Sequence, residues 1–364
     1  MMKIAFLILN LNSGGAERAT SSLANYFAFC GHDVSIITID GTPSFYPLDK
    51  KVNTFYLDLK RLPKGSGFSR LRAEAQRALS LRKCVQKLKP DVLIGMSNIM
   101  TAYTVFCTIF SRIKSVVTER NNPYIYMATP TMTILRKLSC ILCNGFIHQT
   151  KRAQEFFPSI TYNKSSVIPN AVFNPLVSQV APCIERDKTI MAMGRLVRDK
   201  GFDILINAFS MIEKEMPDYK LIIFGNGELR DELLETAERL NIRGRVLLPG
   251  VRDDALFEVA KSSLFVLSSR NEGMPNVLME AMACGVPCVA TRCPMGPEEL
   301  IIDGENGLLV PVEDEKALAE AMLRVLNNKA FANKLSEQSK RIKETHSIEN
   351  IGNKWIEYLK TVIR

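Results

Sequence analysis

The 364-residue sequence lacks several features that would assign its class directly. No apolar run approaches the roughly 18 to 20 residues that a transmembrane helix needs. Its nine cysteines have no framework spacing, and an odd number excludes a fully paired set of disulfides. The Cys-x-x-Cys at Cys140 and Cys143 lies in an apolar segment without a second ligand pair at zinc spacing. We therefore expect buried thiols of a cytoplasmic protein.

Histidine is also scarce. The three histidines, His32, His148 and His346, fall outside every motif described below, and we interpret them as structural. The sequence has no G-x-G-x-x-G fingerprint with an acidic residue in register after it. A nicotinamide-dependent oxidoreductase is therefore not predicted.

Positive charge, in contrast, is concentrated in one segment. The formal net charge is +9, and residues 50–90 hold twelve basic residues against two acidic ones. Such a surplus favours partners rich in phosphate: nucleic acid, anionic lipid headgroups or a pyrophosphate-linked acceptor. A solvated helix face is the alternative. Because the cations are not interleaved with aromatic residues for base stacking, we expect an anionic membrane surface and no nucleic acid.

Strand-like and helix-like patterns alternate along the chain. The short apolar stretch Ile4–Leu9 predicts a buried strand rather than a signal peptide, because a glycine-rich turn and a helical pattern follow it. In the first half, strands are expected at 34–39, 92–96, 115–118 and 145–149, and a helix at 16–30. In the second half, strands are expected at 189–193, 219–225, 246–248, 264–268, 287–290 and 307–310, and helices at 201–213, 229–240 and 276–284. This βαβ alternation predicts two parallel sheets with helices on both faces.

Two domains and a final helix follow from these patterns. The stretch 169–188 contains three prolines and little periodicity, so we place the linker there. The expected domains are two Rossmann-like units, at 1–172 and at 173–345. The remaining 346–364 forms an amphipathic helix that would return to the first domain.

A glycine pair, Gly14-Gly15, lies at the junction of the first strand and its helix. Glycines there let backbone N–H groups approach a phosphate, and a helix N-terminus favours negative charge. A tight structural turn is an equally good interpretation of the pair alone.

Two cations, Arg195 and Lys200, follow the first strand of the second series. Open α/β sheets bind ligands at this edge. Arginine can bind a diphosphate through two parallel hydrogen bonds, while lysine supplies a mobile point charge. The pattern favours a diphosphate site, although surface loops are often basic.

Two glutamates eight residues apart, Glu272 and Glu280, give the strongest signal. Between them a turn at 273–275 opens a helix, where proline suits the first turn and N–H groups stay free to bind a ligand. Glu280 lies in an otherwise apolar helix, so its carboxylate needs a partner such as a ligand hydroxyl. The pair could also be the acid and base of a glycoside hydrolase, about 5 to 9.5 Å apart. Eight helical residues span about 12 Å, which weakens that alternative without excluding it.

Taken in order, these motifs resemble the retaining GT-B glycosyltransferases of family four. The resemblance rests on Gly14-Gly15, Gly194-Arg195 with Lys200-Gly201, Gly225-Asn226-Gly227, Leu248-Pro249-Gly250, and Glu272 with Glu280. It covers nearly the whole chain and is greatest to bacterial enzymes that extend lipid-linked oligosaccharides, including N-acetylgalactosamine transferases. It implies an α/β fold of two Rossmann-like domains that face each other across a cleft holding the active site. The domain at 1–172 would lie on the acceptor side, and the domain at 173–345 would bind the nucleotide sugar.

The resemblance also implies a role for each motif. Arg195 and Lys200 would hold the donor diphosphate and stabilise the leaving nucleotide, where negative charge develops. Glu272 would contact hydroxyls of the transferred sugar, and Glu280 those of the ribose. The expected donor-binding set also includes Gly14, Gly15, Gly225, Gly250, Val251, Gly273, Met274, Pro275 and Asn276.

The implied reaction retains the anomeric configuration by front-face attack, without a covalent enzyme intermediate. No Asp-x-Asp motif lies where a metal-bound diphosphate would need one, so we expect no metal and no cofactor beyond the nucleotide sugar. One departure concerns Arg120, which stands where many relatives carry a histidine near the reacting sugar. Arginine cannot act as a general base near neutral pH, so Arg120 and its neighbour Glu119 are candidates for a different role.

The sequence therefore predicts a cytoplasmic enzyme, peripheral on the inner face of the cytoplasmic membrane. It would move a hexose or N-acetylhexosamine, with N-acetylgalactosamine as the first choice, from a UDP-sugar to a polyprenyl-diphosphate-linked acceptor in bacterial polysaccharide biosynthesis. A GDP-mannose-dependent mannosyltransferase is one alternative. A protein that binds phosphate-rich ligands or nucleic acid without transferase activity is another.

Overall fold

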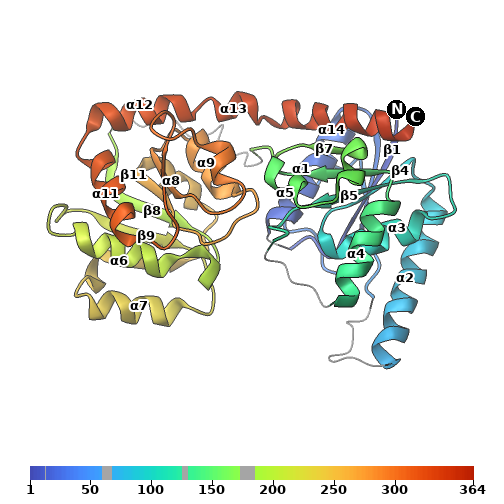
Figure 1. The fold of residues 1–364 in the computed structure, drawn as a ribbon, viewed down its shortest axis with the longest axis horizontal. Helices are drawn as coiled ribbons and strands as arrows, with labels where there is room; N and C mark the ends of the chain where they lie inside the picture. Colours follow the sequence, from blue (N-terminus) through green and yellow to red (C-terminus); the bar gives the residue numbers. More distant parts are fainter. Residues whose placement is uncertain (13, 60–67, 125–129, 173–184) are drawn as a thin grey trace. The chain divides into compact units, whose positions relative to one another are not determined.

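The computed structural model describes residues 1–12, 14–59, 68–124, 130–172 and 185–364. The chain divides into two compact units, one formed by Met1–Phe173 with Ile348–Arg364 and the other by Asn174–Ser347 (Figure 1). Most of the predicted linker lies outside the described residues. Within the described ranges, no helix is long and apolar enough to cross a membrane.

The first unit contains a seven-stranded parallel sheet in the order β3-β2-β1-β4-β5-β6-β7. Its strands are β1 (Lys3–Ile8), β2 (Asp33–Thr38), β3 (Val52–Tyr56), β4 (Val92–Gly95), β5 (Lys114–Glu119), β6 (Gly145–His148) and β7 (Ser165–Val167). Central strands such as β4 are buried throughout, which is why they are continuous apolar runs rather than alternating ones.

Helices cover both faces of this sheet. They are α1 (Gly15–Phe29), α2 (Phe68–Leu88), α3 (Asn98–Thr108), α4 (Pro130–Leu142), α5 (Lys151–Glu155), η1 (Ser159–Lys164) and α14 (Ile348–Ile363). Side chains of α1 and α14 share a core with one face, and those of α2, α3 and α4 cover the other. The expected return of the last helix is confirmed: Trp355 is buried, and the Tyr358 hydroxyl accepts a hydrogen bond from Phe146 N at 2.7 Å.

The second unit contains a six-stranded parallel sheet in the order β10-β9-β8-β11-β12-β13. Its strands are β8 (Asp187–Met193), β9 (Lys220–Phe224), β10 (Val246–Gly250), β11 (Ser262–Leu267), β12 (Cys288–Thr291) and β13 (Leu308–Val310). Its helices are η3 (Arg198–Lys200), α6 (Phe202–Ile212), α7 (Arg230–Arg239), η4 (Arg243–Arg245), α8 (Ala255–Lys261), α9 (Asn276–Ala283), α10 (Pro297–Leu300), α11 (Glu315–Leu326), α12 (Lys329–Ser339) and α13 (Ile342–Thr345). Side chains of α6, α7 and α11 form one large core with the sheet. Two doubly wound parallel sheets were predicted, and this is confirmed.

Candidate active site

The predicted residues of the second unit lie in loops at the carboxyl ends of its strands. Arg195 follows β8, Gly225 follows β9, Gly250 ends β10, and Glu272 follows β11. In open α/β sheets this edge is where ligands bind. The loops therefore place residues from distant parts of the sequence along one edge of the sheet.

Glycines let two of these loops pack backbone against backbone. Gly194 N donates to Phe224 O at 2.9 Å, and Leu196 N donates to Asn226 O at 2.9 Å. Gly225 has a φ of +138°, and a Cβ atom there would lie 1.8 Å from Gly194 O. Only glycine fits such an approach. The Gly225-Asn226-Gly227 motif thus fixes the backbone that carries Arg195.

A short ion pair joins the two most specific predicted residues. Lys200 Nζ lies 2.6 Å from Glu272 Oε1, and the Ser269 hydroxyl donates to the same oxygen at 2.7 Å. Glu272 is only 8% exposed, whereas Lys200 is more accessible. A nearly buried carboxylate needs such partners because water cannot solvate it. The structure therefore brings together the cation and the carboxylate that the sequence singled out.

Arg270 holds the loop after β11 in place, a role that the sequence alone did not predict. Its guanidinium donates to both carboxylate oxygens of Asp203 at 2.7 Å, to Glu313 at 2.5 and 3.1 Å, and to Arg198 O at 2.8 Å. Its backbone N–H donates to Asp199 O at 2.8 Å. Arg270 thus ties the Glu272 loop to η3, which carries Lys200. The sequence signal that could have identified Arg270 is its position two residues before the candidate carboxylate Glu272.

The charges of this cluster influence one another. The hydrogen bonds that Arg270 donates to Asp203 are the main reason that the pKa of Arg270 is raised, and those to Glu313 add to this against the effect of burial. Burial favours a higher pKa for Asp203, but the hydrogen bonds and charge of Arg270 outweigh it and lower the pKa. Both groups therefore stay ionised near neutral pH.

The turn between the two glutamates is held from the next loop of the sheet edge. Gly296 N donates to Gly273 O at 2.8 Å, and a Cβ atom on Gly296 would lie 2.3 Å from the Pro275 ring. Met274 and Pro275 are buried, and α9 begins directly afterwards at Asn276. The helix N-terminus is thus fixed behind Glu272, with positive partial charge on its first N–H groups.

The other predicted donor residues differ in exposure. Glu280 is buried on α9, as its apolar surroundings in the sequence indicated. Arg195 is exposed, and its guanidinium has no ion pair with the described part of the chain. Val251, just after β10, is 68% exposed.

In the first unit, the Gly14 turn is bound by a tyrosine from the loop after β2. The Tyr46 hydroxyl accepts from Gly14 N and donates to Gly14 O, both at 3.2 Å. The guanidinium of Arg18 lies over the same ring, 5.6 Å from its centre. Gly15 is the first residue of α1. The glycine turn therefore has a fixed geometry at the carboxyl edge of this sheet.

Arg120 belongs to a polar cluster at the same edge. Its guanidinium donates to Asn170 Oδ1 at 2.5 Å, and the side-chain amide of Gln149 contacts the side chain of the same asparagine. Burial lowers the pKa of Arg120 to about 10, and the carboxylate of Glu17 opposes this shift. Burial also raises the pKa of Glu17, against the effect of Arg120. The sequence did not identify Asn170, Gln149 or Glu17 as partners of Arg120.

Glu119, the neighbour of Arg120, forms an ion pair with a helix residue. Its buried carboxylate pairs with Arg136 of α4. Burial raises the pKa of Glu119, and the charge of Arg136 offsets part of that effect. We therefore assign Glu119 to the packing of α4 against the sheet.

The two thiols of the Cys-x-x-Cys segment are buried as expected, whereas Cys30 is exposed. Burial raises the pKa of Cys140 to about 12 and that of Cys143 to about 11, so both remain protonated. Among the described residues, no group of histidine, cysteine and acidic side chains could hold a metal ion.

Comparison with known families agrees with the residue pattern. Residues 13–172 match Glycosyltransferase Family 4, and residues 178–342 match Glycosyl transferases group 1. Together they leave only the ends and a short central stretch unmatched. The chain is a glycosyltransferase of the family-4 type. The alternative of a binding protein without transferase activity is therefore not retained.

Relatives support the same assignment along the full length. A Campylobacter jejuni enzyme is 29% identical over 100% of this chain and 99% of its own; its name is GalNAc-alpha-(1->4)-GalNAc-alpha-(1->3)-diNAcBac-PP-undecaprenol alpha-1,4-N-acetyl-D-galactosaminyltransferase. Sucrose-phosphate synthase from Thermosynechococcus elongatus has a TM-score of 0.83 at 19% identity, covering 100% of this chain and 99% of that one. Anabaena HepE, solved in complex with UDP, has a TM-score of 0.79 at 18% identity, covering 99% and 100%. The predicted GT-B fold class is confirmed.

Proposed function

We propose that this glycosyltransferase moves N-acetylgalactosamine, or another hexose or N-acetylhexosamine, from a UDP-sugar to a polyprenyl-diphosphate-linked acceptor. Transfer retains the anomeric configuration and needs no metal. The observation that carries the donor site is the Lys200–Glu272 pair at the carboxyl edge of the second sheet. The named substrate of the Campylobacter relative and the UDP bound to HepE support the choice of acceptor and nucleotide.

The pair explains how one edge binds both halves of the donor. Without donor, Lys200 neutralises the nearly buried carboxylate of Glu272. A diphosphate attracts the lysine, which frees Glu272 Oε1 to accept hydrogen bonds from sugar hydroxyls while Ser269 keeps it oriented. Each such bond to a charged group contributes about 1.5–3 kcal/mol. The carboxylate thus exchanges one partner for another and is never left unpaired.

The same cations stabilise the leaving group. Negative charge develops on the diphosphate as the glycosidic bond breaks, and fixed positive charge at that position lowers the barrier. Arg195 is exposed, so its planar guanidinium is available to bind two phosphate oxygens. The N-terminus of α9 adds a smaller positive potential behind Glu272. Together these groups supply the charge that a metal ion provides in other transferases.

A binding and transfer assay tests the donor class. The full chain is titrated by calorimetry with UDP, UDP-N-acetylgalactosamine, UDP-glucose and GDP-mannose, each with EDTA present. We expect binding and transfer with a UDP-sugar under these conditions, and an α-configured product by NMR. Binding of GDP-mannose alone would favour the mannosyltransferase alternative. Dependence on added Mg²⁺, or a β-configured product, would contradict metal independence or retention respectively.

The basic segment supports a peripheral position on the inner face of the cytoplasmic membrane. In α2, Arg70, Arg72, Lys83 and Lys87 are exposed, whereas Lys60, Arg61 and Lys64 lie outside the described residues. Exposed cations attract anionic lipid with about 1 kcal/mol each near the surface. Sedimentation with vesicles that contain phosphatidylglycerol should recover the protein at low salt. Equal recovery with neutral vesicles would argue against this electrostatic attachment.

A further inference from the structure

The outward face of α4 is apolar. The exposed side chains on this helix include Ile134, Leu135, Leu138, Ile141 and Leu142, which recur at the spacing of one helical stripe. Its inward side carries Ser139 and Cys140, which are buried, as is Cys143 directly after the helix. A surface helix of a globular protein normally has the opposite arrangement, with polar residues toward water. We call the five outward residues the α4 face.

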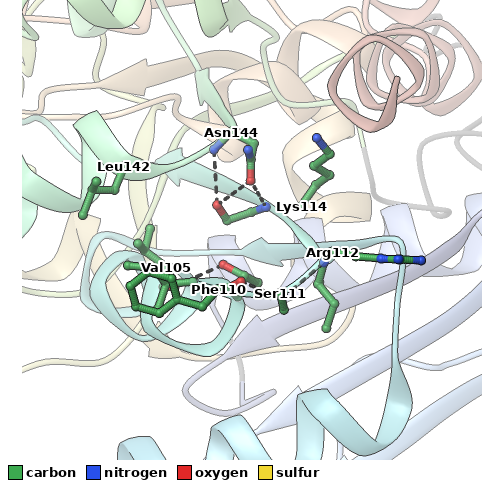
Figure 2. Close-up of a pocket in the computed structure, with 11 residues that line it drawn as sticks. Val105, Phe110, Ser111, Arg112, Lys114, Leu142 and Asn144 are labelled. Carbon is green, nitrogen blue, oxygen red and sulfur yellow. Dashed lines mark hydrogen bonds between the residues drawn. The ribbon is translucent and has the colours of Figure 1, made fainter.

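The apolar surface continues onto the end of α3. Phe110 is 95% exposed and has a φ of +59°, a left-handed conformation that is rare for a bulky residue. Phe110, Val105 and Leu142 line one side of a hollow of about 440 Å³ between α3, β5 and the end of α4. Figure 2 shows these apolar side chains on one side and the cationic Arg112 and Lys114 on the other.

Positive charge surrounds this apolar surface. Residues 130–144 contain no aspartate or glutamate, and Lys137 is exposed on α4. Arg112 and Lys114 lie at the hollow. In the first unit, α2, α3 and α4 cover the same face of the sheet and lie next to one another (Figure 1). The basic outer side of α2 and the apolar α4 face therefore belong to one layer.

We propose that the α4 face and Phe110 insert into the boundary between headgroups and acyl chains of an anionic bilayer. This inference rests on the proposed use of a lipid-linked acceptor, and it goes beyond electrostatic attachment through α2. Interfacial helices combine an apolar stripe with lysine and arginine in this way, and binding grows with buried apolar area and with attraction to anionic lipid. Two protein copies joined through this layer would instead bring like charges together, which opposes association.

A pair of matched substitutions tests the insertion. Leu138 is 50% exposed on α4, and Met211 is 51% exposed on α6 of the second unit. Each is replaced by glutamate in the full chain, and partition is measured by sedimentation with vesicles of roughly three parts phosphatidylcholine to one part phosphatidylglycerol. We expect Leu138→Glu to reduce partition at least tenfold and Met211→Glu to leave it unchanged. Thermal melting and nucleotide binding of both variants check that the fold and the donor site remain intact.

A conservative variant reports insertion directly. The sequence contains one tryptophan, Trp355, and it is buried in the first unit. In Leu138→Trp, the new indole should emit at shorter wavelength when these vesicles are added, and the shift should persist at high salt. Attachment through surface charge alone would be lost at high salt and would leave the emission unchanged.

The outcomes separate this inference from the proposed function. Wild-type partition of Leu138→Glu, or no emission shift in Leu138→Trp, would overturn insertion even if transfer from a UDP-sugar is observed. A wild-type dimer that Leu138→Glu converts to a monomer would also overturn it, because the α4 face would then be a subunit interface. Conversely, normal insertion without UDP-sugar binding would support membrane insertion of the α4 face and contradict the proposed donor.

Discussion

Arg270 and Asp203 form a two-point ion pair, in which the two terminal guanidinium nitrogens each lie 2.7 Å from one carboxylate oxygen. The pair connects the loop after β11 to α6, and thereby to the neighbouring Lys200 loop. Arg270 does not carry a predicted ligand contact of its own. Instead, it fixes the relative positions of Lys200 and Glu272, and these two residues carry the predicted ligand contacts.

Arg270→Ala should reduce activity more than stability. The carboxylate partners of Arg270 are about half exposed, Asp203 to 43% and Glu313 to 57%, so loss of each ion pair should cost about 1 kcal/mol or less in unfolding free energy. Misplacement of the Glu272 loop should lower kcat/KM for the donor by about 10²-fold. Arg292→Ala is the matched control, because Arg292 also pairs with two carboxylates, those of Glu298 and Asp303, on the surface. Equal kinetic losses in both variants would refute a positioning role for Arg270.

Substitutions of Lys200 and of Glu272 should affect nucleotide binding and sugar binding differently. Lys200→Ala should weaken UDP binding at least tenfold, because a cation for the diphosphate is lost. Glu272→Gln should leave UDP binding equal or tighter, because Lys200 is released, but it should abolish transfer. Calorimetry with UDP and with the intact UDP-sugar measures both effects. Lys188→Ala, which removes an exposed pair with Asp218, is the control. Equal losses of UDP affinity in the two site variants would contradict the exchange of partners.

Gly225 should tolerate no side chain. A Cβ atom there would meet Gly194 O at 1.8 Å, at a φ of +138°. We expect Gly225→Ala to lower the unfolding free energy by more than about 2 kcal/mol and to weaken donor binding, because the Arg195 loop must move. Gly244→Ala is a suitable control, since no atom lies within 4 Å of its Cβ position. Urea unfolding compares the two variants, and similar midpoints would argue against the backbone contact.

The sequence predicted the main strands because burial on both faces makes them continuous apolar runs. It missed β3, a partly exposed edge strand whose apolar and polar residues mix. It also missed β7, which has three residues, two of them serines, and forms only by pairing with β6. Such strands depend on a neighbour to complete their hydrogen bonds, so local pattern alone does not reveal them.

The candidate site also contains residues that the sequence could identify and residues that it could not. Lys200 and Glu272 stand in motifs with characteristic spacing, so the sequence could identify them. Arg270, which positions both residues, is held by carboxylates from other parts of the chain. Asp203 lies on α6, and Glu313 lies beyond β13. The partner of Arg120, Asn170, follows a different strand. These contacts arise from the closeness of strand ends in the folded sheet, and one sequence contains no spacing rule for them.

His148 should make the protein less stable in mild acid. It is fully buried beside Phe146 and Phe157, and neither ring nitrogen has a hydrogen-bond partner within the described ranges. Burial lowers its pKa to about 3, so the folded protein keeps it neutral. An unfolded histidine takes up a proton below its ordinary pKa near 6.5, and stability is therefore lost as pH falls from about 6.5 toward 3.

Between pH 7 and pH 5 this effect should lower the unfolding free energy by about 2 kcal/mol. His148→Phe removes the titrating group and suits the aromatic surroundings, so its stability should fall less over the same interval. Urea unfolding at pH 7, 6 and 5 measures the difference between the two proteins. His346→Asn provides the comparison for a histidine that is not fully buried. If the wild-type and His148→Phe proteins lose stability in parallel, the buried imidazole is not the source of acid sensitivity.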